Sequence, residues 1–233
     1  MPDRRKDISL DNRLLQCASF VRDKAKVVDV GTDHGYLAIY LVKIKKAIHA
    51  IASDLREGPL NNALENIKRY GCENLIEPRL SDGLKNIMAQ EADDIVIAGM
   101  GGEVIANIIK STSWLKDETK HLILQPMTMA ENLRRFLFDE GFEIIKEQAI
   151  ISGGKVYTIM IAAFSQGTIK VSDLYPYIGK LEANLDDAGV KYAQREIRDL
   201  RNKIWGCECE GRLDRAKELS KVKSKLENLL NGV

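Results

Sequence analysis

The chain has 233 residues, of which 45% are hydrophobic and 30% are charged, and its formal net charge is +1. This composition is typical of a folded globular protein and excludes a disordered or fibrous chain. No apolar run has membrane-spanning length, and the charged start lacks the apolar segment of a signal peptide, so we expect a cytoplasmic protein without a membrane span. The four cysteines and three histidines show no metal-ligand spacing, which predicts reduced thiols and no metal site.

Short apolar segments alternate with helix-compatible segments through the first two thirds of the chain. The predicted strands are 27–30, 47–53, 76–80, 94–98, 121–125, 142–150 and 156–164. The predicted helices are 36–45, 59–70, 83–89, 102–110 and 129–140. The early strands are continuously apolar, as in a parallel sheet that helices cover on both faces. Only residues 152–155 separate the last two strands, too few for a crossover, so this pair forms an antiparallel hairpin. The pattern predicts an α/β fold with a doubly wound, mostly parallel sheet.

A polar, helical pattern follows a predicted linker at 165–168. Apolar residues recur there at spacings of three and four, as in a coiled-coil seam. The two sets are Ala193, Ile197, Leu200 and Ile204, and then Leu219, Val222, Leu226 and Leu229. The stretch 206–211 breaks the pattern and predicts an antiparallel helical hairpin. We therefore expect two domains, residues 1–165 and residues 166–233.

Basic side chains repeat along the predicted hairpin. One row holds Lys191, Arg195, Arg198 and Arg201, and another holds Lys217, Lys221 and Lys225. Such rows suit the phosphates of a nucleic acid, but they are also typical of a solvated helix surface. The hairpin could equally form a dimer contact, so both a monomer and a homodimer stay open.

The most distinctive segment follows the first strand and reads Asp-Val-Gly-Thr-Asp-His-Gly over residues 29–35. Its glycines let the backbone approach a ligand, and the following helix start offers N–H groups. Asp33 occupies the place where a nicotinamide-binding loop carries its second glycine. A carboxylate here favours a positively charged ligand over a pyrophosphate. S-adenosylmethionine, which carries an ammonium and a sulfonium, meets this requirement.

Acidic and glycine-rich segments also end the next strands. Asp54 closes the second strand, where a dinucleotide fold holds its ribose, and Asp82 follows the third, where it would accept a hydrogen bond from an adenine amine. Each acid alone could be a helix N-cap. Together with Asp29 they mark three successive strand ends, the edge at which open α/β sheets bind ligands. The fourth strand ends in Gly99-Met100-Gly101-Gly102 and the fifth in Gln125-Pro126, at the same edge.

These motifs together resemble the bacterial TrmK family, S-adenosylmethionine-dependent methyltransferases that act on N1 of adenine 22 in tRNA. The resemblance covers residues 8 to 164 and rests on residues 9–14, 29–37, 50–54, 57–60, 97–102 and 122–126. It implies the class I, Rossmann-like methyltransferase fold. One departure is Met127, which stands where some relatives carry an asparagine after the Gln-Pro pair.

The resemblance and the strand-end pattern together assign candidate site residues. We expect the cofactor to be surrounded by Asp29, Gly31, Thr32, Gly35, Asp54, Leu55, Asp82, Gly83, Gly99, Met100 and Gly101. The resemblance implies that the reacting centre is faced by Asp33, His34 and Tyr36. On the tRNA side we expect Gln125, Pro126, Arg195 and Arg198.

The implied reaction needs positioning more than a base. Adenine N1 has a lone pair, so the site supplies in-line geometry and a carboxylate near the charge that builds on the ring. Asp33 suits this task, although it could instead cap the next helix. His34 could be a hydrogen-bonded spacer. Tyr36 could stack on a base or pack beneath the helix.

Two other function classes stay open at this point. One is a small-molecule methyltransferase, which the near-neutral charge favours, and the other is a noncatalytic adenosyl-binding assembly protein. If the protein binds RNA, a second candidate for the RNA-binding surface, besides the hairpin, is the basic cluster near the start of the chain. This cluster holds Arg4, Arg5, Lys6 and Arg13.

Overall fold

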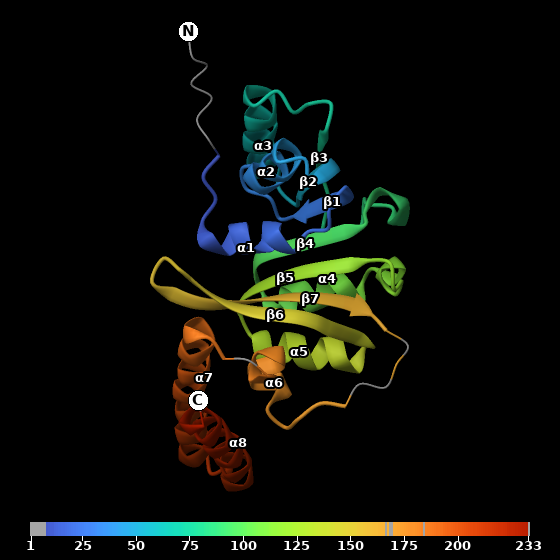
Figure 1. Cartoon of the computed structure of the whole chain (residues 1–233). Coiled ribbons are helices and arrows are strands. Elements are labelled where there is room, and N and C mark those ends of the chain that lie inside the picture. Colours follow the sequence, from blue (N-terminus) through green and yellow to red (C-terminus); the bar gives the residue numbers. More distant parts are fainter. Residues whose placement is uncertain (1–7, 166, 168–169, 184, 233) are drawn as a thin grey trace.

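A seven-stranded sheet with the strand order β3-β2-β1-β4-β5-β7-β6 forms the centre of the computed structural model, which describes residues 8–165, 167, 170–183 and 185–232 (Figure 1). The strands are β1 (Ala25–Val30), β2 (Ala47–Asp54), β3 (Ile76–Leu80), β4 (Asp94–Gly101), β5 (His121–Thr128), β6 (Phe142–Ser152) and β7 (Lys155–Phe164). The α-helices are α1 (Asn12–Phe20), α2 (Tyr36–Lys43), α3 (Glu57–Arg69), α4 (Gly102–Lys110), α5 (Ala130–Asp139), α6 (Tyr175–Ile178), α7 (Asp187–Cys209) and α8 (Leu213–Asn231). Strands β1 to β5 run parallel, and β7 pairs antiparallel with both β5 and β6. The predicted doubly wound sheet with its closing hairpin is confirmed.

Helices cover both faces of this sheet. Successive strand residues point to opposite faces, so Val27 packs with α1 and α2 whereas its neighbour Val28 packs with α4 and α5. Both valines are completely buried. The continuous apolar runs of the sequence follow from this double burial. None of the helices in the described ranges is long and apolar enough to span a membrane.

One predicted helix is wrong, and one observed helix was not predicted. Residues 83–86 form a turn, followed by a short 3-10 helix at Ala89–Glu91, in place of an α-helix at 83–89. The Ser81 hydroxyl accepts from the backbone N–H of Asn86 at 3.1 Å and donates to the carbonyl of Gly83 at 2.9 Å, so a side chain competes with the helical hydrogen bonds. Helix α1 has no counterpart among the predicted helices; its N-cap Asp11 accepts from the N–H of Leu14 at 2.8 Å.

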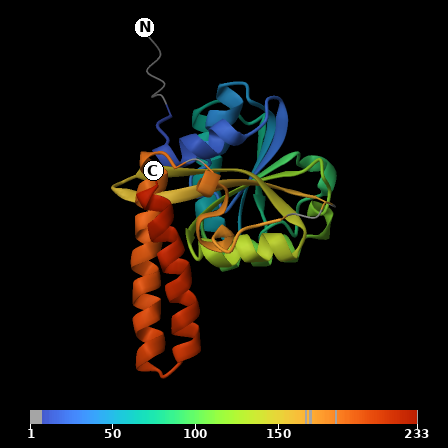
Figure 2. The ribbon, with the colours of Figure 1, turned by 60° about the horizontal axis from the view of Figure 1, so that its bottom comes forward.

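The predicted helical hairpin is present as α7 and α8, which lie side by side in Figure 2. Seam residues such as Ala193 and Leu200 on α7 and Leu226 on α8 are buried in a shared apolar cluster. Helix α7 continues through Gly206 to Cys209, so the break is shorter than predicted and falls at 210–212. The coiled-coil character of the pair and the division into two domains at residue 165 stay predictions. Of the predicted linker, Gln166 and Thr168 lie outside the described residues.

A buried ion pair connects the sheet to the hairpin. Arg134 on α5 and Glu147 on β6 are both completely inaccessible to solvent, and Nη2 of Arg134 lies 2.7 Å from Oε1 of Glu147. The same guanidinium donates to the carbonyls of Pro176 and Tyr177, each at 2.9 Å, and to the hydroxyl of Tyr192 on α7 at 2.9 Å. One cation therefore connects α5, β6, α6 and α7.

Removing only the cation should destabilise the whole protein. We expect Arg134→Met to lower the free energy of unfolding by about 3–5 kcal/mol, because Glu147 is then buried without a partner. Urea denaturation followed by circular dichroism measures this. The double variant Arg134→Met/Glu147→Leu should recover most of the loss, since no buried charge remains.

The neighbouring Arg135 provides the matched control. Its side chain is 45% exposed and pairs with Glu131 at 3.4 Å, so Arg135→Met should cost no more than about 1 kcal/mol. Equal losses of stability for the two arginine variants would contradict a special role for the buried pair.

Candidate functional site

The predicted site segments meet along one edge of the sheet. Strands β1 to β5 are parallel, so their carboxyl ends lie together. The register confirms the order, because Val30 of β1 faces Ser53 of β2 and Ile97 of β4, and Met100 of β4 faces Pro126 of β5. Residues 29–35, 54–55, 82–83, 99–101 and 125–126 consequently form a row along this strand-end edge.

The glycine turn after β1 is bound to β2. The N–H groups of Gly31 and Thr32 donate to the carbonyl of Ser53 at 2.8 and 2.9 Å, and the N–H of Gly35 donates to the Thr32 hydroxyl at 3.0 Å. These three N–H groups therefore hold the turn together, and the free N–H groups expected at the start of the following helix stay a prediction. Gly31 has φ +77°, which favours glycine, and the flexible end of the Met100 side chain lies against it, with Cε 2.1 Å from the position a Cβ would take.

Asp29 and Asp54 lie within this row and differ from ordinary surface acids. Asp29 is buried, and burial raises the pKa of its carboxyl to about 6, although the hydrogen bond from Thr32 acts in the opposite direction. Nearby Asp54 adds a smaller upward contribution to the pKa of Asp29. Oδ1 of Asp54 accepts from the backbone N–H of Arg56 at 2.8 Å. Two carboxyls of β1 and β2 are therefore close enough to influence one another.

The β3 side of the edge is more open. Asp82 is exposed and hydrogen-bonded to Lys85, next to Gly83. Leu55, just beyond Asp54, has 63% of its surface exposed. An apolar side chain between two carboxylates suits a flat heterocycle with hydrogen-bond donors on its rim, such as an adenine base.

Asp33, His34 and Tyr36 form a contiguous group on the turn. Nε2 of His34 lies 3.1 Å from Oδ2 of Asp33, and the rings of His34 and Tyr36 stack with centroids 5.4 Å apart. The side chain of Asp33 is 71% exposed and that of His34 is 45% exposed. Asn66 on α3 holds the carbonyl of His34 at 3.0 Å. The structure thus brings together the three residues expected at the reacting centre and leaves the acid open to a substrate.

Gln125 is not open to a substrate. It is completely buried, and its Oε1 accepts from Nη1 of Arg13 at 2.7 Å and from the N–H of Gly99 at 3.0 Å. Its Nε2 donates to the carbonyl of Pro126 at 2.9 Å. Both polar atoms of the amide are therefore engaged inside the protein, and the expectation that Gln125 lies on the tRNA side stays a prediction.

Arg13 is a site residue that the sequence patterns assigned only to a possible basic RNA surface. Its side chain is 18% exposed, and its guanidinium bonds Gln125 at the strand-end edge. The signal was present, since Arg13 belongs to the segment 9–14 that carries part of the family resemblance. Of the proposed basic cluster, Arg4, Arg5 and Lys6 lie outside the described residues.

Arg195 has hydrogen-bond partners within the protein. Its Nη1 donates to the carbonyl of Val156 on β7 at 2.7 Å, its Nη2 donates to Glu196 at 2.8 Å, and its guanidinium lies 4.4 Å from the Tyr192 ring centroid. The guanidinium thus anchors α7 to the β6–β7 hairpin, and the expectation that Arg195 lies on the tRNA side stays a prediction. Arg198, one helical turn further, is exposed.

Two grooves lie beside α7 where it packs on the sheet. One of about 520 Å³ runs between the β6–β7 hairpin and α7, and its walls include Lys155, Tyr157, Lys191 and Arg198. The other, of about 440 Å³, lies between α7 and the loop after β5. Met127, exposed over 40% of its surface, lines both grooves and so connects the hairpin to the strand-end edge.

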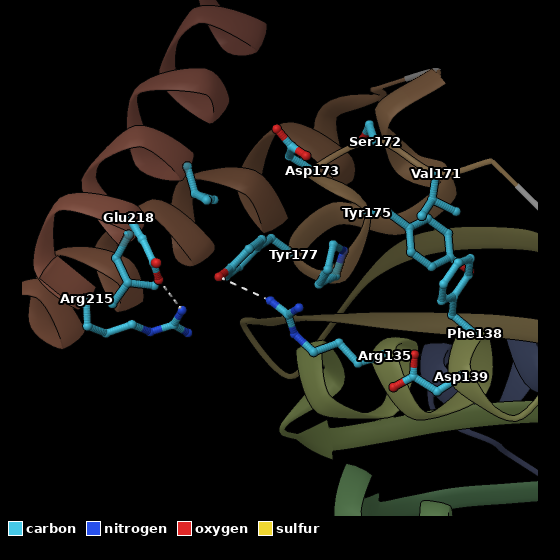
Figure 3. Close-up of a pocket in the computed structure, with 13 residues that line it drawn as sticks. Arg135, Phe138, Asp139, Val171, Ser172, Asp173, Tyr175, Tyr177, Arg215 and Glu218 are labelled. Carbon is cyan, nitrogen blue, oxygen red and sulfur yellow. Dashed lines mark hydrogen bonds and ion pairs between the residues drawn. The ribbon is translucent and has the colours of Figure 1, made fainter.

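A further cavity of about 470 Å³ lies between α5, residues 171–177 and α8 (Figure 3). Arg135 donates to the hydroxyl of Tyr177 at 3.4 Å there, and Arg215 pairs with Glu218 at 2.9 Å. Its lining residues belong to none of the strand-end segments. Acidic and basic groups alternate in it, so its chemistry favours no particular ligand.

The strand-end edge fits S-adenosylmethionine. Carboxylates at the ends of β1, β2 and β3 match a ligand rich in donors and positive charge. Within the described ranges, His, Cys, Asp and Glu residues form no group of three that could hold a metal.

Comparison with known proteins agrees with this fit. Residues 10–160 match the family model of a methyltransferase domain. The chain is 36% identical over 156 residues to the tRNA (adenine(22)-N(1))-methyltransferase of Bacillus subtilis, over 67% of this chain and 66% of that protein. The alignment therefore spans slightly less than two thirds of that relative.

Solved structures match over nearly the whole chain. The crystal structure of the B. subtilis m1A22 tRNA methyltransferase TrmK has a TM-score of 0.85 at 29% identity, covering 96% of this chain and 100% of that one. A putative tRNA (m1A22) methyltransferase of Streptococcus pneumoniae in complex with S-adenosyl-L-methionine has a TM-score of 0.82 at 32% identity, covering 95% of this chain and 100% of that one. This chain belongs to the methyltransferase domain family and, within it, to the TrmK family.

Proposed function

We propose that this protein is an S-adenosylmethionine-dependent methyltransferase that methylates N1 of adenine 22 in tRNA. The observation that carries the proposal is the extent of the structural likeness, which includes the C-terminal hairpin as well as the sheet. A small-molecule methyltransferase requires only the sheet and its strand-end edge. A hairpin that flanks this edge with a basic groove is better suited to a large polyanion. Because tRNA is the substrate, we place the enzyme in the cytoplasm.

The cofactor supplies a methyl group that its positive sulfonium makes electrophilic. We assign Asp54 to the ribose hydroxyls and Asp82, beside Leu55 and Gly83, to the adenine base. Asp29, Thr32 and Gly35 build the turn through the hydrogen bonds given above, and Gly31, Gly99, Met100 and Gly101 shape the edge around the methionine portion. The carboxylates account for a preference over pyrophosphate-containing dinucleotides, which carry negative charge where these acids lie.

The group on the turn is suited to orient an adenine. The exposed carboxylate of Asp33 can accept a hydrogen bond from the exocyclic amine, and this becomes stronger as positive charge develops on the ring. His34 holds the carboxylate from one side and stacks on Tyr36. The two rings offer a flat surface beside the reacting centre. No base is needed, because N1 attacks through its lone pair.

The direct test is to map the modified nucleoside. Unmodified tRNA carrying adenine 22, incubated with the protein and labelled S-adenosylmethionine, should acquire one methyl group at N1 of that adenine. A transcript with guanine at position 22 is the matched control and should stay unmodified. Methylation of both transcripts, or of neither, contradicts the proposed target.

Substitutions of Asp33 and of Asp54 should affect different steps, methyl transfer in the first case and cofactor binding in the second. Asp33→Ala should lower kcat steeply while the affinity for S-adenosylhomocysteine changes little, since the interaction is made with the reacting adenine. Asp54→Ala should weaken cofactor binding by roughly 1–3 kcal/mol, the contribution of hydrogen bonds to a charged partner. Single-turnover methylation and isothermal titration measure the two quantities separately.

Glu73→Ala, an exposed acid in the turn between α3 and β3, is the control for loss of a negative charge and should change neither quantity. If Asp33→Ala reduces cofactor affinity as much as Asp54→Ala does, Asp33 only builds the loop.

The groove between α7 and the β6–β7 hairpin should bind phosphates of the tRNA backbone. We expect Lys191→Glu/Arg198→Glu to weaken tRNA binding and to reduce the slope of log K against log salt by about one unit for each phosphate that the variant no longer neutralises. Arg195 is left intact because its guanidinium anchors the helix. Fluorescence anisotropy at several salt concentrations gives the slope.

Lys217→Glu/Lys221→Glu makes the same change in charge on α8, where both side chains are exposed. This control should reduce the slope less. If it reduces the slope more than the α7 variant does, the RNA lies on α8 and the groove assignment fails.

A further inference from the structure

Helix α3 packs against the turn that carries Asp33 and His34. The contact is made at Gly35, where a Cβ would lie 3.2 Å from Cβ of Ala63 on the helix. Gly35 also has φ +69°, a conformation that favours glycine. Ala63 is completely buried. The turn and the helix are therefore in close contact, and a side chain on this face of α3 can reach the backbone of the turn.

Asn66 is the polar residue on this buried face. The buried residues of α3 are Ala63, Asn66 and Ile67, and Asn66 follows Ala63 at the spacing of three that places two residues on one face. Its Nδ2 donates to the carbonyl of His34 at 3.0 Å. Burying an amide costs free energy unless it is hydrogen-bonded, so an apolar residue would pack at this position at lower cost. The bond to His34, rather than packing, therefore accounts for an asparagine here.

The carbonyl of His34 lies at the centre of the group assigned to the reacting centre. A hydrogen bond to this oxygen orients the plane of the peptide that joins His34 to Gly35. The imidazole of the same residue lies 3.1 Å from Oδ2 of Asp33 and stacks on the ring of Tyr36. Because the side chain of Asp33 is 71% exposed, the protein controls its orientation chiefly through this backbone and through His34.

Helix α3 also begins beside an acid that we assign to the cofactor. Oδ1 of Asp54 accepts from the N–H of Arg56, the N-cap of α3, at 2.8 Å. One helix of 13 residues therefore meets the ribose acid at its start and the turn with Asp33 at Asn66. Methyl transfer needs the attacking and donating groups in line, and a misplacement of about 1 Å can cost about 100-fold in rate. A helix that contacts both places is suited to keep this alignment.

We propose that Asn66 is a positioning residue for methyl transfer. Through the carbonyl of His34 it holds the turn so that the carboxylate of Asp33 meets the adenine amine, and it acts without touching the cofactor or the RNA. The inference rests on the proposed function of Asp33 and adds to that site a residue from outside the strand-end segments.

A double-mutant cycle on the rate of methyl transfer tests this role. The single-turnover rate at saturating S-adenosylmethionine is measured on unmodified tRNA for the wild type, Asn66→Ala, Asp33→Ala and the double variant. Asn66→Ala should lower the rate about 10- to 100-fold, whereas its affinity for S-adenosylhomocysteine in isothermal titration should stay within about twofold of the wild-type value. In the Asp33→Ala background the same change should lower the rate by less than about twofold, because the group through which Asn66 acts is already missing.

Equal effects of Asn66→Ala with and without Asp33 would overturn the proposal, because effects of independent residues multiply. An unchanged rate for Asn66→Ala, or a loss of cofactor affinity as large as the loss of rate, would overturn it as well. Asn61→Ala is the matched control, since it removes the same side chain from an exposed position of the same helix, and it should change neither quantity.

Asn66→Asp takes the place of Asn66→Ala if the alanine variant does not fold at the assay temperature. It keeps the size of the side chain and replaces the donating NH2 group by a carboxylate oxygen, which only accepts, so the same loss and the same cycle are expected. A failure of both variants to fold would overturn the proposal, since Asn66 would then be required by the fold itself.

The cycle counts methyl groups on whichever nucleotide accepts them, so methylation away from adenine 22 contradicts the proposed target and leaves the cycle valid. A wild-type protein that transfers no methyl group to tRNA would refute the proposed function, and this inference with it. An active wild type with independent effects of the two substitutions refutes the role of Asn66 alone.

Discussion

The buried guanidinium of Arg134 is the interaction on which the arrangement of sheet and hairpin depends. It neutralises Glu147 in an interior that would otherwise hold an isolated charge, and its remaining N–H groups bind two carbonyls before α7 and a tyrosine on it. Thr158 of β7 donates to the same carboxylate oxygen at 2.6 Å. Breaking any one of these contacts leaves a buried polar group unsatisfied, so the parts they join are held as a unit.

The position of the basic groove is a consequence of this network. Tyr192 receives a hydrogen bond from Arg134 on one side and the cation–π contact of Arg195 on the other, so α7 starts against the β6–β7 hairpin. The exposed side chains of Lys191 and Arg198 then face the groove that Met127 connects to the strand-end edge. A charge pair remote from the reaction thus determines how a polyanion would meet the catalytic edge.

The strand-end edge is built on a turn whose backbone is hydrogen-bonded within the protein. The N–H groups of the glycine turn are engaged with Ser53 and Thr32, which makes the loop rigid before any ligand arrives. The carboxylates at the ends of β1, β2 and β3 lie along the same edge, and Asp29 among them is buried.

The sequence by itself determined the fold class, the strands and the acids of the edge. Strands buried on both faces require continuous apolar runs, and a glycine turn after a strand has a local signature, so neighbouring residues suffice to predict both. The helix expected at 83–89 does not form, because the Ser81 hydroxyl takes over local hydrogen bonds, and the spacing of apolar residues does not reveal this competition.

Only the tertiary structure decided the roles of the arginines. Arg195 meets Val156 across 39 positions, and Arg13 meets Gln125 across 112 positions. Partners so far apart are selected by the packing of whole elements. The periodicity of a sequence shows which face of a helix a residue occupies, but it does not show which element packs against that face.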